Sequence, residues 1–300
     1  TNYLKNLKKQ EKHLMDISLS LFNQIHLLKN FQDSGYFKIL NCKYNSIMKY
    51  SVKEFYKKDL HIKGKKAPYY ISPILNNYGF THAFFTKNSS DIELKYISKH
   101  FQKNYKNCHI KQIHSNNIVF GSETNENNLV FADGLISDKE NQNLWIYTAD
   151  CMPILVADLR NKIVASLHCG RKGLEKKIIK KSIRLLKNLG SNQRDLLIAI
   201  GPTISSKKYF VDKDTYHKFH IKINSKIHSD DVPKKNFHLI DSKNKIELDL
   251  KKYAYYQLIN ENIHSTNIDI SNKCTYISNN EFHSYRKTKT DKRQWSFISN

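Results

Sequence analysis

Three residues carry the side chains of a transition-metal site: His114, Cys151 and His168. Zinc accepts both thiolate sulfur and imidazole nitrogen as ligands. Three protein ligands with a fourth position open are the pattern of a catalytic zinc rather than a structural one. Because the three residues do not form a compact C-x-x-C arrangement, their spacing alone leaves zinc as a hypothesis.

Cys151 has two other roles that its residue type permits. A free buried cysteine behaves as a small hydrophobic residue, which is its commonest fate. Cys151 and His168 would alternatively form the nucleophile–base pair of a cysteine hydrolase. A metal-bound thiolate is a poor free nucleophile, so the zinc hypothesis assigns no covalent catalysis to Cys151. The residues alone leave the three roles open.

The segments around these residues are predicted to be buried strands. Apolar runs at residues 144–149 and 153–157 flank Cys151, and a third run at 163–167 ends on His168. The runs are short, rich in β-branched and aromatic residues, and bounded by polar residues. Strand ends hold side chains rigidly while letting them face a cleft. We therefore expect Cys151 and His168 to point into one site.

A helix is predicted to follow His168. Apolar residues recur at helical spacing after Gly170, and Gly190 marks the end of the pattern. The start of this helix would direct free N–H groups and its positive dipole end at the same cleft. Further predicted elements are strands at residues 80–86, 196–202 and 274–278 and a helix at residues 247–263.

Six segments occur in one order: KQIHS, ADGLIS, TADCMPILVAD, ASLHCGRKGL, IGPTIS and SYRK…KRQWSFI. Together they resemble the bacterial laccase-domain family, also called multicopper polyphenol oxidase or peptidoglycan editing factor proteins. Members of this family are now regarded as purine nucleoside phosphorylases. The resemblance covers residues 79–298. It implies an α/β fold, a four-layer α/β/β/α sandwich with mixed sheets.

The resemblance also implies a metal and a reaction. The matching family residues bind zinc, which maps onto His114, Cys151 and His168, and copper is a possible alternative metal. The implied reaction cleaves adenosine, inosine and methylthioadenosine with phosphate to the free base and ribose 1-phosphate. Adenosine deamination is the implied side activity. The expected small-molecule partners are therefore a purine nucleoside and phosphate.

Five further residues are predicted to serve this site. Asp133 and Asp150 are catalytic candidates that would orient a ligand histidine or handle a proton, although each also fits an ordinary turn at a strand end. Arg286 matches the family's arginine and would bind phosphate or ribose oxygens. Arg171 and Lys172 are predicted to bind substrate, and they stand where the family more often has Trp followed by Arg.

Composition fits a globular enzyme. The 300 residues have a formal net charge of +23, and 39% of them are hydrophobic. The lysines are spread along the whole chain, which disfavours a dedicated nucleic-acid patch but attracts a substrate that carries phosphate. Two alternatives remain: a copper-dependent polyphenol oxidase, and a basic nucleic-acid-binding protein without turnover. A multicopper centre would need many more clustered histidines than the six segments supply.

Two regions are predicted: an N-terminal extension, residues 1–66, and a laccase-domain-like region, residues 67–300. The extension is expected to be partly helical, with an amphipathic helix within residues 14–31, and GKKAP at residues 64–68 reads as a linker. Five cysteines, an odd number without paired spacing, indicate a reducing compartment. No apolar run reaches the ~18 residues of a membrane span, and no signal peptide is recognisable. Residues 1–66 contain no arginine, which disfavours an organellar transit peptide. We therefore expect a cytoplasmic protein that does not bind membranes; its oligomeric state is left open.

Overall fold

The computed structural model describes residues 50–125, 128–224 and 245–300. Residues 51–300 form one compact unit. This unit includes residues 51–66, which we placed in the extension. The helix predicted within residues 14–31 lies outside the described residues. Among the described helices, none is long and apolar enough to cross a bilayer.

The first of two large sheets has six strands, in the order β1-β4-β5-β16-β9-β6. Its strands are β1 (Tyr56–Lys58), β4 (Tyr69–Ile71), β5 (His82–Phe85), β16 (Gln294–Ser299), β9 (Gln142–Thr148) and β6 (Lys106–Cys108). The pair β6–β9 is parallel and the other pairs are antiparallel. The chain's last strand, β16, therefore lies in the middle of this sheet.

The second large sheet also has six strands, in the order β15-β12-β10-β11-β8-β7. Its strands are β15 (Ile268–Ile270), β12 (Leu196–Ile200), β10 (Met152–Asp158), β11 (Val164–Cys169), β8 (Gly134–Ile136) and β7 (Ile118–Phe120). The pairs β12–β15 and β7–β8 are parallel, and the three pairs between them are antiparallel. Both sheets are mixed, as predicted.

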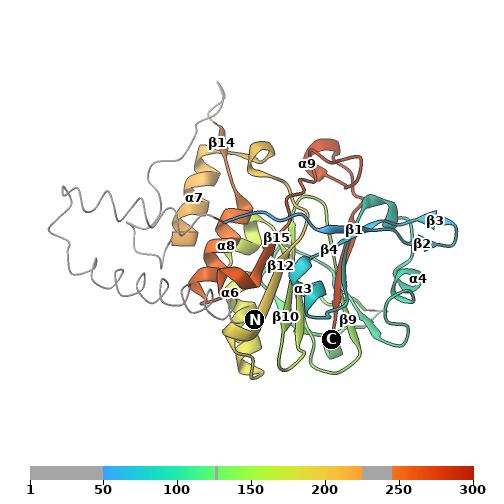
Figure 1. The fold of residues 1–300 in the computed structure, drawn as a ribbon. Helices are drawn as coiled ribbons and strands as arrows, with labels where there is room; N and C mark the ends of the chain where they lie inside the picture. The colour runs from blue at the N-terminus through green and yellow to red at the C-terminus, as the bar shows by residue number, and fades with distance from the viewer. Residues whose placement is uncertain (1–49, 126–127, 225–244) are drawn as a thin grey trace, which may run out of the picture. The chain divides into compact units, whose positions relative to one another are not determined.

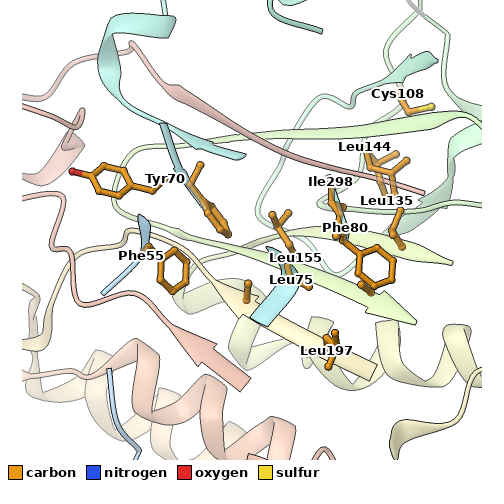
Figure 2. Packing of buried hydrophobic residues seen from close by; sticks show 14 of the residues in the cluster. Phe55, Tyr70, Leu75, Phe80, Cys108, Leu135, Leu144, Leu155, Leu197 and Ile298 are labelled. Carbon is orange, nitrogen blue, oxygen red and sulfur yellow. The ribbon is translucent and has the colours of Figure 1, made fainter. Parts of the chain in front are cut away.

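The two sheets pack face to face. Successive side chains of a strand point to opposite sides, so each sheet has an inner face against the other sheet and an outer face. Phe84 of β5 and Leu144 of β9 belong to a core that also contains Leu155 of β10 and Leu197 of β12. Figure 2 shows Leu144, Leu155 and Leu197 in this core. Their neighbours Phe85 and Trp145 belong to a separate core on the outer face of the first sheet.

Helices cover both outer faces, which completes four layers. Ile97 of α4 (Leu94–Ser98) packs into the core beside Phe85 and Trp145. On the other side α6 (Ile178–Asn188) contacts β8 and β11, and α8 (Leu250–Asn260) packs on α6. Figure 1 shows α6 and α8 on one side of the sheets and α4 on the other. The predicted α/β class is confirmed.

The shorter elements connect these layers. The remaining helices are α3 (Pro73–Asn77), α5 (Arg171–Glu175), α7 (Lys213–Asn224) and α9 (Tyr285–Thr288). The short 3₁₀ helices are η1 (Lys87–Ser89), η2 (Gly121–Glu123), η3 (Gln193–Asp195), η4 (Ser206–Lys208) and η5 (Ser265–Asn267). Two small antiparallel pairs are β2 (His61–Ile62) with β3 (Lys65–Lys66), and β13 (Phe210–Asp212) with β14 (Lys245–Glu247).

The predicted linker at residues 64–68 is wrong. Lys63 and Gly64 have φ angles of 49° and 74°, which are the left-handed values of a tight hairpin turn between β2 and β3. A turn of this kind needs only two residues. The first residue of GKKAP, Gly64, is the second turn residue, and the two lysines after it form β3. The apparent break in the sequence pattern is therefore a hairpin.

Two further predictions need correction. The single helix expected between Gly170 and Gly190 is two helices, α5 and α6, because Lys177 between them has a φ of 60°. Gly190 has a φ of 92° and ends α6 as predicted. The strand predicted at residues 274–278 is wrong: Cys274 forms only an isolated β-bridge with Thr203, and residues 275–278 form turns. The strand of that region is β15, whose register with β12 ends before residue 274.

Candidate metal centre and its surroundings

The structure brings the three predicted ligands together. One ligand atom each from His114, Cys151 and His168 lies within 4.8 Å of the others. The Cys151 Sγ and His114 Nε2 atoms are 3.9 Å apart, and the two imidazole rings are nearly perpendicular. In the described part of the chain, this is the one group of three or more side chains that could hold a metal ion.

Strand register explains why Cys151 and His168 meet. The turn that contains Cys151 connects β9 in the first sheet to β10 in the second. Beyond the turn, Met152 of β10 pairs with Cys169 of β11, so Cys151 lies opposite Gly170. A Cβ atom on Gly170 would be 2.6 Å from the Cys151 sulfur. Glycine is therefore required at position 170 by the close approach of the thiol.

Asp133 connects the two candidate ligand histidines. Its buried carboxylate accepts hydrogen bonds from Nδ1 of His168 at 2.8 Å and from the backbone N–H of His114 at 2.9 Å. The N–H and hydroxyl of Ser115 donate to it at 2.5 and 2.6 Å. These bonds hold the His114 backbone at a φ of 56°, a strained value for a residue other than glycine. Asp133 therefore orients both histidines.

The site favours a thiolate beside a protonated imidazole when no cation is bound. Burial raises the pKa of the Cys151 thiol, but the charge of His168 and hydrogen bonds from both histidines lower it below its ordinary value. Burial lowers the pKa of His168, but the Cys151 charge and the Asp133 hydrogen bond raise it above its ordinary value. The lowered pKa favours the thiolate of Cys151, which is the form that binds a metal.

These residues fit a bound zinc or copper ion. Two imidazoles and a thiolate are a known donor set for both metals. Because Asp133 occupies Nδ1 of His168, the Nε2 atom on the Cys151 side is the one that could bind a metal, which is the usual carboxylate–histidine–metal arrangement. Cys169 does not join the group: its buried sulfur lies near Gly173, on the other side of the strand.

Asp150 links the metal site to the segment that carries Arg286. Its two carboxylate oxygens accept hydrogen bonds from the Thr275 hydroxyl at 2.6 Å and from the Arg286 backbone N–H at 2.7 Å. Its backbone carbonyl accepts bonds from the Thr203 hydroxyl and the Ile204 N–H. With a φ of 85°, Asp150 is strained and held from several sides.

The three predicted substrate-binding cations differ in their surroundings. The Arg286 guanidinium donates to the Phe210 carbonyl at 3.1 Å. Arg171 forms an ion pair with Glu175 one helical turn further along α5. Lys172 is exposed on the same short helix. Arg171 and Lys172 follow Gly170 directly, so their backbone is anchored beside the Cys151 sulfur.

Tyr209 is a residue of this site that the sequence did not reveal. The Arg286 guanidinium lies over its ring at 4.8 Å from the centroid, and its hydroxyl is hydrogen-bonded to Arg171. Burial and the Cys151 charge raise the pKa of Tyr209, although the two arginines act against this. One tyrosine among 18 carries no sequence signal, and only its position between the two arginines identifies it.

Comparisons with known proteins identify relatives of this chain. A family model described as multi-copper polyphenol oxidoreductase laccase matches residues 92–300. A purine nucleoside phosphorylase of Synechocystis is 28% identical over 243 residues, which are 72% of this chain and 88% of the relative. One from Borreliella burgdorferi is 31% identical over 213 residues, which are 68% of this chain and 86% of the relative.

Solved structures share the fold. The hypothetical protein YfiH of Bacillus licheniformis superposes with a TM-score of 0.63 at 22% identity, over 77% of this chain and 96% of that one. YlmD of Geobacillus stearothermophilus superposes with a TM-score of 0.65 at 20% identity, over the same shares of 77% and 96%. The match of the family model to residues 92–300, together with this fold, shows that the chain belongs to the multi-copper polyphenol oxidoreductase laccase family.

Proposed function

We propose that this protein is a zinc-dependent purine nucleoside phosphorylase. Its substrates would be adenosine, inosine and methylthioadenosine, and its products the free base and ribose 1-phosphate. The observation that supports this most is the assembled group of His114, Cys151 and His168, in a chain whose relatives are named purine nucleoside phosphorylases. Adenosine deamination is proposed as a side activity of the same centre.

The ligand residues have defined tasks in this proposal. His114, Cys151 and His168 would hold the metal, and Asp133 would keep His168 in the tautomer that leaves Nε2 free. When bound, zinc supplies Lewis acidity and lowers the pKa of a bound water towards ~7. Asp150 has both carboxylate oxygens bonded to other parts of the chain. We therefore propose that it positions Cys151 and Arg286, rather than transferring a proton.

The cationic residues would serve the phosphate. In phosphorolysis a phosphate oxygen bonds to the anomeric carbon of the ribose while the bond from that carbon to the purine nitrogen breaks. The base leaves with the bonding electrons and takes up a proton. Arg286 and Lys172 would bind and neutralise the phosphate, and Arg171 would hold the nucleoside or the phosphate next to Tyr209.

Two measurements on the purified protein test the proposal. Elemental analysis should find one zinc per chain, and a copper content above the zinc content would contradict the metal assignment. Incubation of inosine with phosphate should release hypoxanthine and ribose 1-phosphate in equal amounts, with no release when phosphate is omitted. A zinc-loaded, folded protein that leaves all three nucleosides intact would exclude the phosphorylase.

The description of the family names polyphenol oxidation, but the site favours it less. A multicopper oxidase needs several copper ions with clustered histidines, whereas the described residues hold a single group of three ligands. Of the cysteines in the described segments, Cys108, Cys151, Cys169 and Cys274 are all free thiols. This agrees with the proposed reducing, cytoplasmic location, which fractionation of the source cells would test.

A further inference from the structure

A cavity of about 750 Å³ lies apart from the metal ligands. Four chain segments form it: the β2–β3 hairpin and residues 87–91, 279–283 and 288–292, the last of which begin at the end of α9. None of His114, Cys151 and His168 lines it. Its volume is in the range of small-molecule binding pockets, roughly 300–1,000 Å³. The cavity is therefore large enough for a ligand well beyond the size of a single ion.

The charge of the cavity is positive. Its lining includes four lysines and one carboxylate, namely Lys65, Lys66, Lys87, Lys292 and Asp91. From outside the lining, Asp59 pairs with Lys66 at 3.0 Å, so the formal charge of the group is 4 − 2 = +2. Lys292 pairs with Asp91 at 2.9 Å. Lys87 donates to one backbone carbonyl at 2.8 Å, and its ammonium keeps two further N–H groups for a ligand.

The neutral side chains of the lining can all supply hydrogen bonds. Among the described residues that line the cavity, the uncharged ones have hydroxyl, amide or imidazole side chains, and none is apolar. His283 is half-buried, with Nε2 at 3.1 Å from the Ser90 hydroxyl. Burial and the charges of Lys87 and Lys292 lower the pKa of His283, which agrees with a positive potential there.

These features select a class of ligand. A net positive charge suits a phosphate group, and hydroxyl and amide side chains suit the hydroxyl groups of a sugar. A purine base would need a larger aromatic or apolar wall than the single imidazole of His283 that lines the cavity. We infer that this cavity is a binding site for a phosphorylated sugar, separate from the metal centre.

The segment 284–292 connects the two sites. The Arg286 N–H bonds to Asp150 beside the metal ligands, whereas Thr288, Thr290 and Lys292 line the cavity. Ribose 1-phosphate, the product of the proposed reaction, belongs to the ligand class that the cavity suits. Only this link to the product rests on the proposed function; the ligand class rests on the cavity itself.

Calorimetric titration of the full chain with ribose 5-phosphate, inorganic phosphate and ribose tests the inference. We expect ribose 5-phosphate to bind with a stoichiometry of one and more weakly as salt is raised. Lys65→Glu and Lys87→Ala should each weaken this binding tenfold or more. Lys103→Glu, a charge reversal at an exposed lysine outside the cavity, should leave it within twofold. Unchanged affinity in both cavity variants, with folding verified by circular dichroism, would overturn the site.

Two further arms identify the ligand and separate the two sites. Thr290→Val should weaken ribose 5-phosphate more than inorganic phosphate, and equal affinities of the wild-type protein for these two probes would overturn the sugar assignment. Binding should persist in Cys151→Ala, in which phosphorolysis is expected to be lost. Loss of binding in Cys151→Ala would place the ligand at the metal centre instead. Absence of phosphorolysis in the wild type would remove the proposed function but leave the titration result intact.

Discussion

Asp133 accepts a hydrogen bond from Nδ1 of His168 at 2.8 Å, and the same oxygen accepts the N–H of His114. One buried carboxylate thus sets the orientation of two ligands from distant parts of the chain. Asp133→Asn keeps the shape but removes the charge and one acceptor. We expect zinc affinity to fall about ten- to a hundredfold, as is typical for partners of ligating histidines. Competition with a chromophoric chelator measures this.

The control for that variant is Asp138→Asn, since Asp138 bonds to Ser122 and Gln142 and to none of the three candidate ligands. Its zinc affinity should match the wild type. An unchanged zinc affinity in Asp133→Asn would mean that the histidines are held by the backbone alone.

Cys151→Ala should abolish zinc binding together with both proposed activities, because both would use one metal centre. Cys169→Ala provides a matched control: the two thiols lie close in space, but Cys169 points towards Gly173. Elemental analysis after dialysis should find zinc in Cys169→Ala and almost none in Cys151→Ala. The reverse result would show that Cys169, and not Cys151, is the thiolate ligand.

Arg286→Ala and Lys172→Ala should depress phosphorolysis more than adenosine deamination, because only phosphorolysis requires a bound phosphate. A lost charge-assisted contact is worth roughly 1.5–3 kcal/mol, or about ten- to a hundredfold in rate. Adenine and inosine formation from adenosine, measured with and without phosphate, separates the two reactions. Equal losses of both products would show that these residues hold the nucleoside or the fold.

Tyr209 should act through Arg286. Tyr209→Phe keeps the ring under the guanidinium but loses the hydroxyl that bonds to Arg171. Tyr209→Leu loses both contacts. A cation–π contact is worth about 0.5–2 kcal/mol, so we expect Leu to raise the KM for phosphate several-fold above that of the Phe variant. Identical KM values in the two variants would show that the ring does not position Arg286.

His82 should make stability depend on pH. It is buried, contacts the Phe80 carbonyl through Nδ1 and accepts the Ser72 N–H at Nε2. Burial lowers its pKa from 6.5 to about 4. Between these values the unfolded chain binds a proton that the folded chain does not, so stability falls as pH falls from 6.5 to 4. The loss should approach about 3 kcal/mol.

Urea unfolding of the wild type and of His82→Gln, at pH 7.5 and again near pH 4, measures this contribution. The variant should be less stable at neutral pH but should lose less stability on acidification, because it has no imidazole to protonate. Equal losses in the two proteins would mean that the acid sensitivity comes from other groups.

The sequence by itself was enough to propose the three candidate ligands and to predict most of the strands around them. Apolar runs at residues 144–149, 153–157 and 163–167 correspond to β9, β10 and β11. Strands of this kind are encoded locally, because short buried runs of β-branched residues have few alternatives. The ordered segments around His114, Cys151 and His168 were enough to suggest the site, because a metal centre restricts residue type more than almost any other feature.

The tertiary structure alone decided how the site is supported. The helix after Gly170 breaks at Lys177 because the Lys176 carbonyl accepts a bond from Asn116 at 2.7 Å, while the Lys176 ammonium donates to the His114 carbonyl at 3.0 Å. Helical periodicity continues through that point, so the pattern did not reveal the break. Contacts with a distant loop outweighed local propensity.

The same reason explains the roles of Asp150 and Tyr209. Asp150 bonds to Thr275 and Arg286, and Tyr209 lies against Arg286. These residues are far apart in the sequence, and hydrophobic periodicity predicts only local structure. Residues 275–278 form turns instead of a strand, and the Thr275 hydroxyl donates to the Asp150 carboxylate. Such long-range hydrogen bonds form only once both sheets have packed, because closing the intervening loops costs entropy that local segments do not recover.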